Sequence, residues 1–492
     1  MTDNAPSIDR LRERILGCWL GKSVGGTLGM PVEGCPTPLD LKFYDPVPTE
    51  MIPNDDLDLQ VVWAFVMDRL AEPRVDRHVL AGAWHKHVGF PWDEYGVAKR
   101  NLAMGLRPPV SGAYDNWFTR GMGAAIRSEL WACLAAGNPR LAAAYAYEDA
   151  CVDHAGEGIW AEVFLAALEA AAFVERDPNR LLDIALAELP VASELRQAVN
   201  NTRLWWELGH AWEPVRHNIL QGYGQDNFTD VVMNLCFIVL GWLASGGDFS
   251  RGICTAVNCG MDTDCTGATL GALMGILEPD CIGQEWLKPI GRDLVLSRAI
   301  TGVRAPKTID AFADLVMGLR DRLGGRPPAP EIVESPTAHL AIRARRAFAN
   351  SWSACQQPHH KDLFARGEGI VLPGTIAGLP YGEVAGRFLL LQYKLHLAAA
   401  RKVKLIFNSP QDVRVFLDGQ RVLARECGEV CPAFHRAPMY QMGAFDLSAG
   451  GHEVAAVLAK PRLPEDLQWV IGVGDAATDE WLPEVFERVG AP

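Results

Sequence analysis

The sequence predicts a mainly α-helical, multi-helix domain followed by an antiparallel β-sandwich. Its 492 residues exceed the usual size of one hydrophobic core, so two domains are expected. Alanine- and leucine-rich stretches with helical periodicity dominate the first part of the chain, whereas short stretches rich in β-branched residues follow residue 380. A segment rich in glycine and proline lies between them. We therefore expect a helical domain at 8–323, a linker at 324–335 and the β-sandwich at 336–492.

The helical domain is predicted from periodicity and from helix-start signals. Its clearest helices are expected at Arg140–Ala150 and Ile159–Phe173, where apolar residues recur with the helical period. The pairs Asn138-Pro139 and Asp177-Pro178 are typical of helix starts. The longest apolar stretch, Val231–Ala244, is too short to span a bilayer and is expected to be a buried helix. No strand is expected before residue 380.

The β-sandwich is predicted from several short alternating segments. Strands are expected at Val403–Asn408, Val413–Gly419 and His452–Ala459. Turns are expected at Asp418-Gly419 and Gly450-Gly451. Several short strands with turns at this spacing favour an antiparallel sandwich.

Composition excludes several classes of partner. The formal charge of −14 and the lack of a basic tract argue against a nucleic-acid-binding surface. No segment is long and apolar enough for a membrane partner, and the polar start of the chain lacks the features of a signal peptide. The twelve cysteines include no C-x-x-C pair, which indicates reduced thiols. A cytoplasmic location is expected.

The most informative motif is the segment Gly260–Gly271. Asp262 and Asp264 alternate with threonines at the start of a predicted helix, where the helix dipole favours anions. Glycines at 267, 271 and 275 share one helix face, so another helix can approach closely. A dense cluster of oxygen atoms suits a hard divalent cation such as Mg²⁺, Mn²⁺ or Ca²⁺. The alternative is a simple acidic helix cap.

Two earlier segments complement this motif. In the first, glycines at 21, 25 and 29 repeat the close-packing spacing, and Glu33 lies just past the expected helix end. In the second, Pro53–Gln60 contains three aspartates at a helix start. Helix capping is again the alternative. Adjacent carboxylates repel one another, however, so such a cluster gains much from a bound divalent cation.

The order of these motifs resembles that of the ADP-ribosylglycohydrolase family, which includes the dinitrogenase reductase-activating glycohydrolases. Over roughly residues 10–300, G-xxx-G-xxx-G-x-P-x-E, an Asp-Asp helix start, G-x-G-xxx-R, a His-Gly segment and G-x-D-T-D occur in order. The resemblance implies an all-helical fold with a binuclear Mg²⁺ or Mn²⁺ centre in a cleft. Departures from the family motifs at Asn54 and Cys265 indicate a divergent branch, which also has an added C-terminal β-domain.

The resemblance also implies roles for individual residues. Its metal ligands match Asp55, Asp56, Asp262 and Asp264. Glu33 matches a glutamate that lies beside the metals and takes part in catalysis in some members. Asn54 replaces a usual threonine, and its amide oxygen can serve a hard cation. Cys265 replaces a usual hydroxyl residue and is a poor match for Mg²⁺, so either Cys265 or the next residue, Thr266, is the further ligand. Asp58 is a possible compensating ligand.

Such a centre suits cleavage of a glycosidic bond. Two cations can orient sugar hydroxyls and lower the pKa of a bound water, and cleavage at the anomeric carbon needs a positioned acid or base. Glu33 is the first candidate for activating the water, and Asp115 is the second. Asn116 and His154 are expected to contact substrate, although a lone histidine is more often a core residue. Arg127 is expected to pair with a phosphate or to form a structural ion pair.

The motifs bear on three possible functions. The leading hypothesis is a metal-dependent hydrolase acting on a small-molecule glycoside or an ADP-ribosylated substrate. The second is a catalytically silent protein that binds ADP-ribose, a nucleotide or a sugar, which Cys265 and Asn54 favour. The third, a purely structural helical bundle, is disfavoured because these motifs occur together and in order. In the β-domain, which resembles carbohydrate-associated modules in pattern only, a ligand surface or core and turn positions are the alternatives for Trp352, His435, Tyr440 and Trp469.

Overall fold

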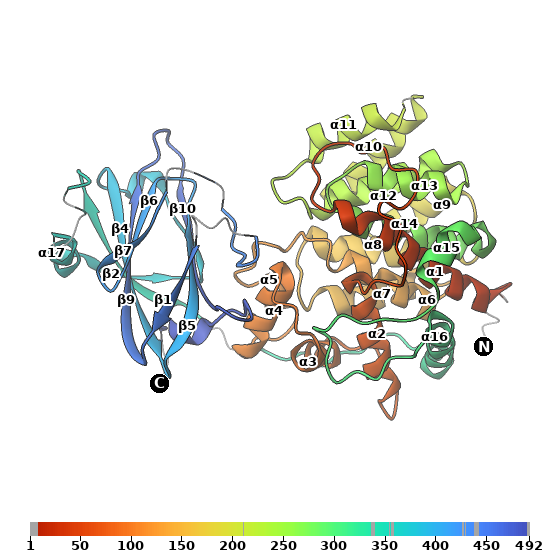
Figure 1. The fold of residues 1–492 in the computed structure, drawn as a ribbon, viewed down its shortest axis with the longest axis horizontal. Coiled ribbons are helices and arrows are strands. Elements are labelled where there is room, and N and C mark those ends of the chain that lie inside the picture. The colour runs from red at the N-terminus through yellow and green to blue at the C-terminus, as the bar shows by residue number, and fades with distance from the viewer. Residues whose placement is uncertain are drawn as a thin grey trace. The chain divides into compact units, whose positions relative to one another are not determined.

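The computed structural model divides the chain into two compact units (Figure 1). It describes residues 8–209, 211–335, 340–353, 355, 359–425, 428, 430–436 and 442–489. The first unit contains the chain up to residue 89, together with 108–113 and 118–332. The second contains 90–107, 114–117 and the chain from residue 333. The predicted domains are continuous segments, whereas these units are not.

The first unit is helical. Its helices are α1 (Leu11–Gly29), α2 (Asp55–Asp68), α3 (Arg77–His87), α5 (Val110–Ala113), α6 (Ser128–Leu134), α7 (Pro139–Ala150), α8 (Glu157–Ala172), α9 (Pro178–Ala187), α10 (Glu194–Glu207), α11 (Trp212–Tyr223), α12 (Val231–Ser245), α13 (Phe249–Asn258), α14 (Thr263–Leu277), α15 (Gln284–Ile290) and α16 (Ile309–Leu323), with short 3₁₀ turns η1 (Met30–Val32), η2 (Ala125–Arg127) and η3 (Pro279–Cys281).

The predicted helices are confirmed as α7, α8 and α12. Asn138 and Asp177 cap α7 and α9 with their side chains, each with a proline in the first turn. Almost every residue of α12 is buried, as expected for a core helix. Within the described residues, no helix combines the length and apolar character that crossing a membrane requires.

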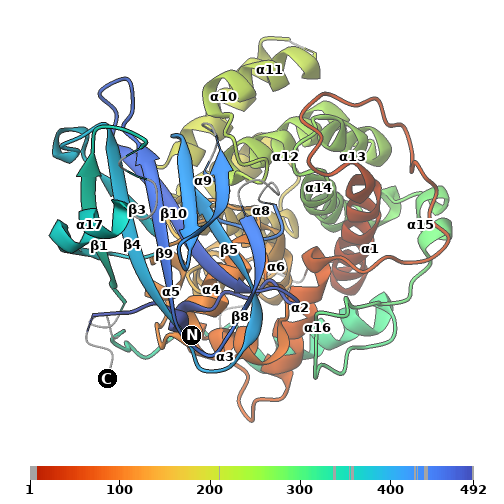
Figure 2. The ribbon, with the colours of Figure 1, turned by 60° about the vertical axis from the view of Figure 1, so that its left-hand side comes forward.

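Helices α1 and α14 lie side by side along two stripes of glycine (Figure 2). A Cβ atom added at Gly21 would lie 2.0 Å from the backbone oxygen of Gly271, and one at Gly25 would lie 1.9 Å from that of Gly267. These distances are far below van der Waals contact, so only glycine permits this approach. The predicted close packing is confirmed, and it brings the start of α14 beside the end of α1.

Substituting Gly25 with alanine is expected to destabilise the protein by about 1–3 kcal/mol, because the new methyl group overlaps backbone atoms that cannot move aside singly. Urea denaturation measures the effect. The matched control is Gly82→Ala in α3, where an added Cβ meets no atom within 4 Å. That substitution is expected to stabilise α3 by about 0.5–1 kcal/mol. Equal effects at the two positions would contradict the close contact.

The second unit is built around two antiparallel sheets. Its strands are β1 (Ile342–Ala349), β2 (Glu368–Leu372), β3 (Ile376–Leu379), β4 (Phe388–Leu397), β5 (Arg401–Asn408), β6 (Val413–Leu417), β7 (Gln420–Arg425), β8 (Met442–Leu447), β9 (Gly450–Ala459) and β10 (Leu467–Asp475), with helices α4 (Asp93–Ala103) and α17 (His359–Arg366) and 3₁₀ turns η4 (Tyr381–Glu383) and η5 (Pro483–Val485). The strand orders are β2-β1-β4-β9-β6-β7 and β3-β10-β5-β8.

Both sheets contribute to one apolar core. Leu391 from β4, Leu405 from β5 and Trp469 from β10 belong to the same buried cluster. The Trp469 indole Nε1 donates to the Tyr393 hydroxyl at 2.8 Å, which links a strand of one sheet to a strand of the other. This arrangement is consistent with the predicted sandwich.

The three predicted strands are confirmed as β5, β6 and β9. Asp418 and Gly419, with φ of 47° and 84°, form the tight turn between β6 and β7. The expectation of no strand before residue 380 is wrong, since β1, β2 and β3 precede it. In β1 the buried positions are occupied mostly by alanines, at 344, 347 and 349, and alanine is a weak strand signal.

Helix α4 joins the second unit through side-chain contacts. Lys99 pairs with Glu480 at 2.9 Å. The Arg100 guanidinium donates to the Thr375 hydroxyl at 3.2 Å and lies over the Trp481 ring at 5.1 Å. These contacts explain why a helix from the early part of the chain belongs to the β unit.

The β-domain residues considered for a ligand surface occupy mostly structural positions. Trp469 is buried in the core. Trp352 is half-buried, stacks against Phe388 and carries the Arg414 guanidinium over its ring at 3.9 Å. His435 Nε2 lies 3.6 Å from a carboxylate oxygen of Asp93 in α4. Tyr440 lies outside the described residues.

Candidate metal centre

The loop after α1 is joined to the loop before α14. The Gly34 amide donates to the Met261 carbonyl at 2.8 Å, and the Met261 amide donates to the Cys35 carbonyl at 2.7 Å. The buried Arg216 guanidinium donates to a backbone carbonyl in each loop, at 2.7 and 2.6 Å. These bonds hold Glu33 beside the N-terminus of α14.

Two groups of candidate ligands meet at this N-terminus. The first is Glu33, Asp262 and Asp264, and the second is Asp56, Asp264 and Cys265. Within each group, one donor atom from every residue lies within 4.8 Å of the others. Asp264 belongs to both groups. Five of the residues predicted from sequence are therefore brought together from the end of α1 and the starts of α2 and α14.

Burial and mutual repulsion make the free carboxylates unfavourable as anions. Burial, with Asp56 and Glu33, raises the pKa of Asp264 to about 7. Burial, with Asp264 and Glu33, raises the pKa of Asp262 well above its usual range. The Oδ1 atoms of Asp262 and Asp264 are buried without a hydrogen-bond partner in the described part of the chain. Unpaired buried oxygens of this kind fit a divalent cation, which would supply the missing contacts.

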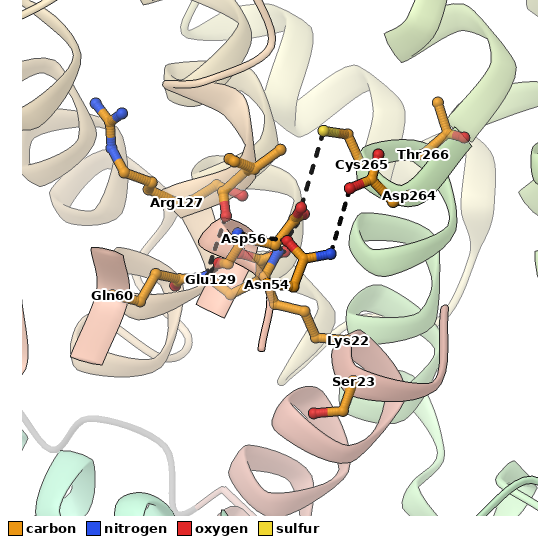
Figure 3. A network of polar contacts seen from close by, with 12 residues as sticks. Lys22, Ser23, Asn54, Asp56, Gln60, Arg127, Glu129, Asp264, Cys265 and Thr266 are labelled. Carbon is orange, nitrogen blue, oxygen red and sulfur yellow. Dashed lines mark hydrogen bonds and ion pairs between the residues drawn. The ribbon is translucent and has the colours of Figure 1, made fainter. Parts of the chain in front are cut away.

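The Asn54 side chain, which the sequence predicts as a ligand, makes two hydrogen bonds to aspartates of the centre. Its Oδ1 accepts from the Asp56 amide at 2.8 Å and so caps α2. Its Nδ2 donates to Asp264 Oδ2 at 3.3 Å (Figure 3). The amide oxygen is thus used by the helix, and the side chain connects the starts of α2 and α14.

The other aspartates of the α2 start lie outside the two groups. Asp55 is half-buried, and burial with Asp56 and Asp264 raises its pKa well above the usual range. Asp58 is fully buried and accepts from the Ser297 amide at 3.1 Å. Asp55 thus adds a further carboxyl group near the cluster, and Asp58 binds the backbone of a loop distant in sequence.

Cys265 faces the centre and Thr266 does not. The Cys265 Sγ lies 3.8 Å from Asp56 Oδ2, whereas the Thr266 hydroxyl donates to the Thr263 carbonyl of its own helix at 3.1 Å. Figure 3 shows the two side chains on different sides of α14. Of the two alternatives open in the sequence, Cys265 occupies the candidate ligand position.

Sequence reasoning missed Lys22, the buried cation next to the centre. Its Nζ lies 3.3 Å from Asp56 Oδ1 and 2.8 Å from Glu129 Oε1, and the Gln60 amide donates to Glu129 Oε2 at 2.8 Å (Figure 3). Burial lowers the pKa of Lys22, but Glu129 and Asp56 outweigh burial and raise it. The side chain is therefore an ammonium ion. The available signal was a lysine within a helix of small and apolar residues.

Asp115 and Asn116 lie in the second unit. The Asp115 carboxylate accepts from the Thr375 amide at 2.8 Å, the Thr375 hydroxyl at 2.7 Å and the Ile376 amide at 2.9 Å, and it pairs with Arg100 at 3.2 Å. Asn116 follows it in the same unit. A carboxylate with this many donors fixes the start of β3, so we assign neither residue to the chemistry.

Arg127 and His154 belong to a buried network in the first unit. The fully buried Arg127 guanidinium makes two bonds to Asp153, at 3.0 and 2.9 Å, and one to Asp149 at 2.9 Å. His154 is also fully buried, with Nδ1 2.9 Å from Asp153 Oδ1. These contacts support the structural ion pair for Arg127 and the core position for His154. We therefore do not assign either residue to substrate.

Comparisons with known proteins identify a family for the larger part of the chain. The family model described as ADP-ribosylglycohydrolase matches residues 7–322. A solved structure titled as an ADP-ribosylglycohydrolase-related protein complex is 22% identical and covers 63% of this chain and 98% of that chain, with a TM-score of 0.45. Two further structures match at lower identity. The PA14 domain of the antifreeze protein MpAFP is 9% identical, covers 32% of this chain and 95% of that chain, and has a TM-score of 0.17.

The GH31 α-xylosidase from Xanthomonas citri is 13% identical, covers 30% of this chain and 16% of that chain, and has a TM-score of 0.18. None of the curated proteins matches the chain. The family model alone covers well over half of the residues, including both groups of candidate ligands. The resemblance predicted from the ordered motifs is thereby confirmed: the chain belongs to the ADP-ribosylglycohydrolase family.

Proposed function

We propose that this protein is a glycoside hydrolase with two divalent cations, Mg²⁺ or Mn²⁺, at the α14 N-terminus. Its substrate would carry an ADP-ribosyl, ribosyl or similar small sugar group in N- or O-glycosidic linkage. The observation that supports the proposal is Asp264, a buried carboxylate shared by two groups of candidate ligands. A carboxylate shared by two ligand groups can contact both ions of a two-metal site.

Each residue of the centre has a distinct task in this proposal. Asp262 and Asp264 would hold one cation beside Glu33, and the group containing Asp56 and Cys265 would hold the other. When bound, such cations polarise sugar hydroxyls and lower the pKa of water. Asn54 orients Asp264 through its amide hydrogen bond.

Glu33 is the candidate general base. It is the exposed member of the two groups, whereas Asp56, Asp262 and Asp264 are buried. Its loop is fixed by backbone bonds to the start of α14, so the carboxylate is both accessible and positioned. A positioned carboxylate can take the proton of the water that attacks the anomeric carbon.

The substitution Glu33→Gln is expected to lower the turnover number by about 100-fold or more, because general-base catalysis contributes at least that factor. The assay measures release of ribose or ADP-ribose from ribosyl nucleosides and ADP-ribosyl-arginine, with Mn²⁺ and with EDTA. Glu50→Gln, at an exposed loop position, is the control and is expected to leave turnover unchanged. Turnover that persists in EDTA and in Asp262→Ala would contradict the metal-dependent mechanism.

The second candidate is a binding protein without catalysis. Cys265 favours it, because a thiol replaces a hydroxyl donor beside Asp56. The same panel separates the two functions. Binding of Mn²⁺ and ADP-ribose in calorimetry, with no product released from any substrate, would support the binding protein.

A further inference from the structure

The two groups of candidate ligands differ in their chemistry. Glu33, Asp262 and Asp264 offer carboxylate oxygens alone, which suit Mg²⁺ and Mn²⁺. The other group adds the sulfur of Cys265 to oxygens of Asp56 and Asp264. Magnesium prefers a shell of six oxygens, including water, whereas a thiolate is a ligand for softer ions. The second group therefore does not fit the pair of identical hard cations.

We infer that Cys265 determines the metal specificity of the second group, which takes a transition-metal ion such as Zn²⁺, Co²⁺ or Fe²⁺ while the carboxylate group takes Mg²⁺ or Mn²⁺. The inference rests on the two-cation centre proposed above and changes the ion expected at the position that includes Cys265. It assigns the two positions to different ions, so the centre is heterometallic.

The position of the sulfur supports this assignment. Cys265 Sγ lies 3.8 Å from Asp56 Oδ2. A sulfur and an oxygen bound to one zinc ion lie no farther apart than the sum of the two bonds, about 4.3–4.5 Å. The thiol is placed by the first turn of α14, whose glycine face is fixed against α1. The neighbouring Thr266 hydroxyl is turned to its own helix and cannot replace the sulfur.

The carboxylates of this group each have one oxygen already used. Lys22 lies 3.3 Å from Asp56 Oδ1, and Asn54 donates to Asp264 Oδ2. Asp56 Oδ2 remains toward Cys265, and Asp264 Oδ1 is buried without a hydrogen-bond partner among the described residues. The group thus offers one carboxylate oxygen from Asp56, one from Asp264 and the sulfur of Cys265. Three protein ligands and an open position are typical of catalytic sites for zinc.

A structural role for this cysteine would need different surroundings. A buried cysteine used only for packing behaves as a small hydrophobic residue. Cys265 instead has Asp56, Asp262 and Asp264 as its electrostatic neighbours. A thiol among carboxylates contributes little to an apolar core.

The test is a titration of the metal-free full-length protein with Co²⁺, followed by absorption spectroscopy and calorimetry. We expect a thiolate-to-cobalt charge-transfer band in the near ultraviolet for the wild type. We expect Cys265→Ser and Cys265→Ala to lose the band and to weaken Co²⁺ and Zn²⁺ binding at this position by at least about 10-fold. Mn²⁺ binding at the carboxylate group is expected to remain. Cys281→Ser, in η3 beyond the far end of α14, is the control and should keep the band.

The outcomes separate this inference from the proposed function. A wild-type cobalt complex without the band, or a band that survives in both Cys265 variants, would overturn the role of Cys265 and leave the metal centre standing. Tighter binding of Mg²⁺ than of Zn²⁺ at both positions would do the same. If neither Mn²⁺ nor Co²⁺ binds, the proposed metal centre itself is wrong.

Discussion

Replacing Asp264 with asparagine is expected to abolish binding of divalent cations at both positions. Asp264 is the residue common to the two groups, and the substitution keeps its size while it removes the charge. Losing even an outer-shell partner weakens metal affinity by about 10–100-fold, so the shared ligand should cost at least about 100-fold. Isothermal titration with Mn²⁺ measures this loss. Asp40→Asn, at an exposed position, is the control.

The same substitution is expected to stabilise the metal-free protein at neutral pH. The pKa of Asp264 is raised to about 7 in the folded state, so the folded protein holds a proton that the unfolded chain releases near pH 4. The free energy of unfolding therefore falls as the pH rises from about 4 to 7, and the Asp264→Asn substitution removes this contribution. Urea denaturation in EDTA at pH 5 and 7.5 measures it. Unchanged cation binding, or a lower stability of the variant at pH 7.5, would contradict the clustered carboxylates.

Replacing Lys22 with methionine is expected to destabilise the protein by about 3–5 kcal/mol at neutral pH. The ammonium ion lies between Asp56 and Glu129, all three are almost fully buried, and removing one partner of a buried ion pair leaves an uncompensated charge. Methionine retains most of the volume, so the loss reports charge and not packing. The Asp56 ligand would also lose its orientation, which should weaken cation binding.

The effect of Lys22→Met should depend on pH. Without the ammonium ion, the buried Asp56 and Glu129 fold in the protonated form, while the same groups ionise in the unfolded chain above about pH 4. The folded state then binds more protons, so the variant loses stability as the pH rises from 5 to 8. Urea denaturation at these two pH values checks this slope. Lys42→Met, at an exposed position, should show none, and an equal loss at pH 5 and pH 8 would argue against a buried ion pair.

The sequence predicted the parts of this centre that depend on short-range pattern. Glycines four residues apart indicate a close helix contact wherever they lie in a helix, and the structure pairs the stripe through Gly21 with the stripe through Gly271. Aspartates at helix starts likewise predict an anionic helix end. Both features can be predicted from the residues of one helix, without knowing which element packs against it.

The rest depends on which side chains meet in three dimensions. Lys22 was missed because its partners, Asp56 and Glu129, come from two other helices. The sequence suggests Asp115 as a possible acid or base, yet its carboxylate binds the backbone at Thr375, distant in sequence. Strand β1 was missed because alanines, which are uncommon in strands, occupy most of its buried positions. Composition and spacing do not specify such pairings, since they arise only when the helices and sheets pack.

The interleaving of the two units has a consequence for how this chain can be divided. The segment matched by the family model, 7–322, includes 90–107 and 114–117, which belong physically to the β unit. A fragment ending after the linker would keep Lys99, Arg100 and Asp115 but lose Glu480, Thr375 and Ile376. The end of the family match is therefore not a boundary between the two units. Truncation or domain exchange at residue 335 would leave the charged side chains of Lys99, Arg100 and Asp115 without these partners.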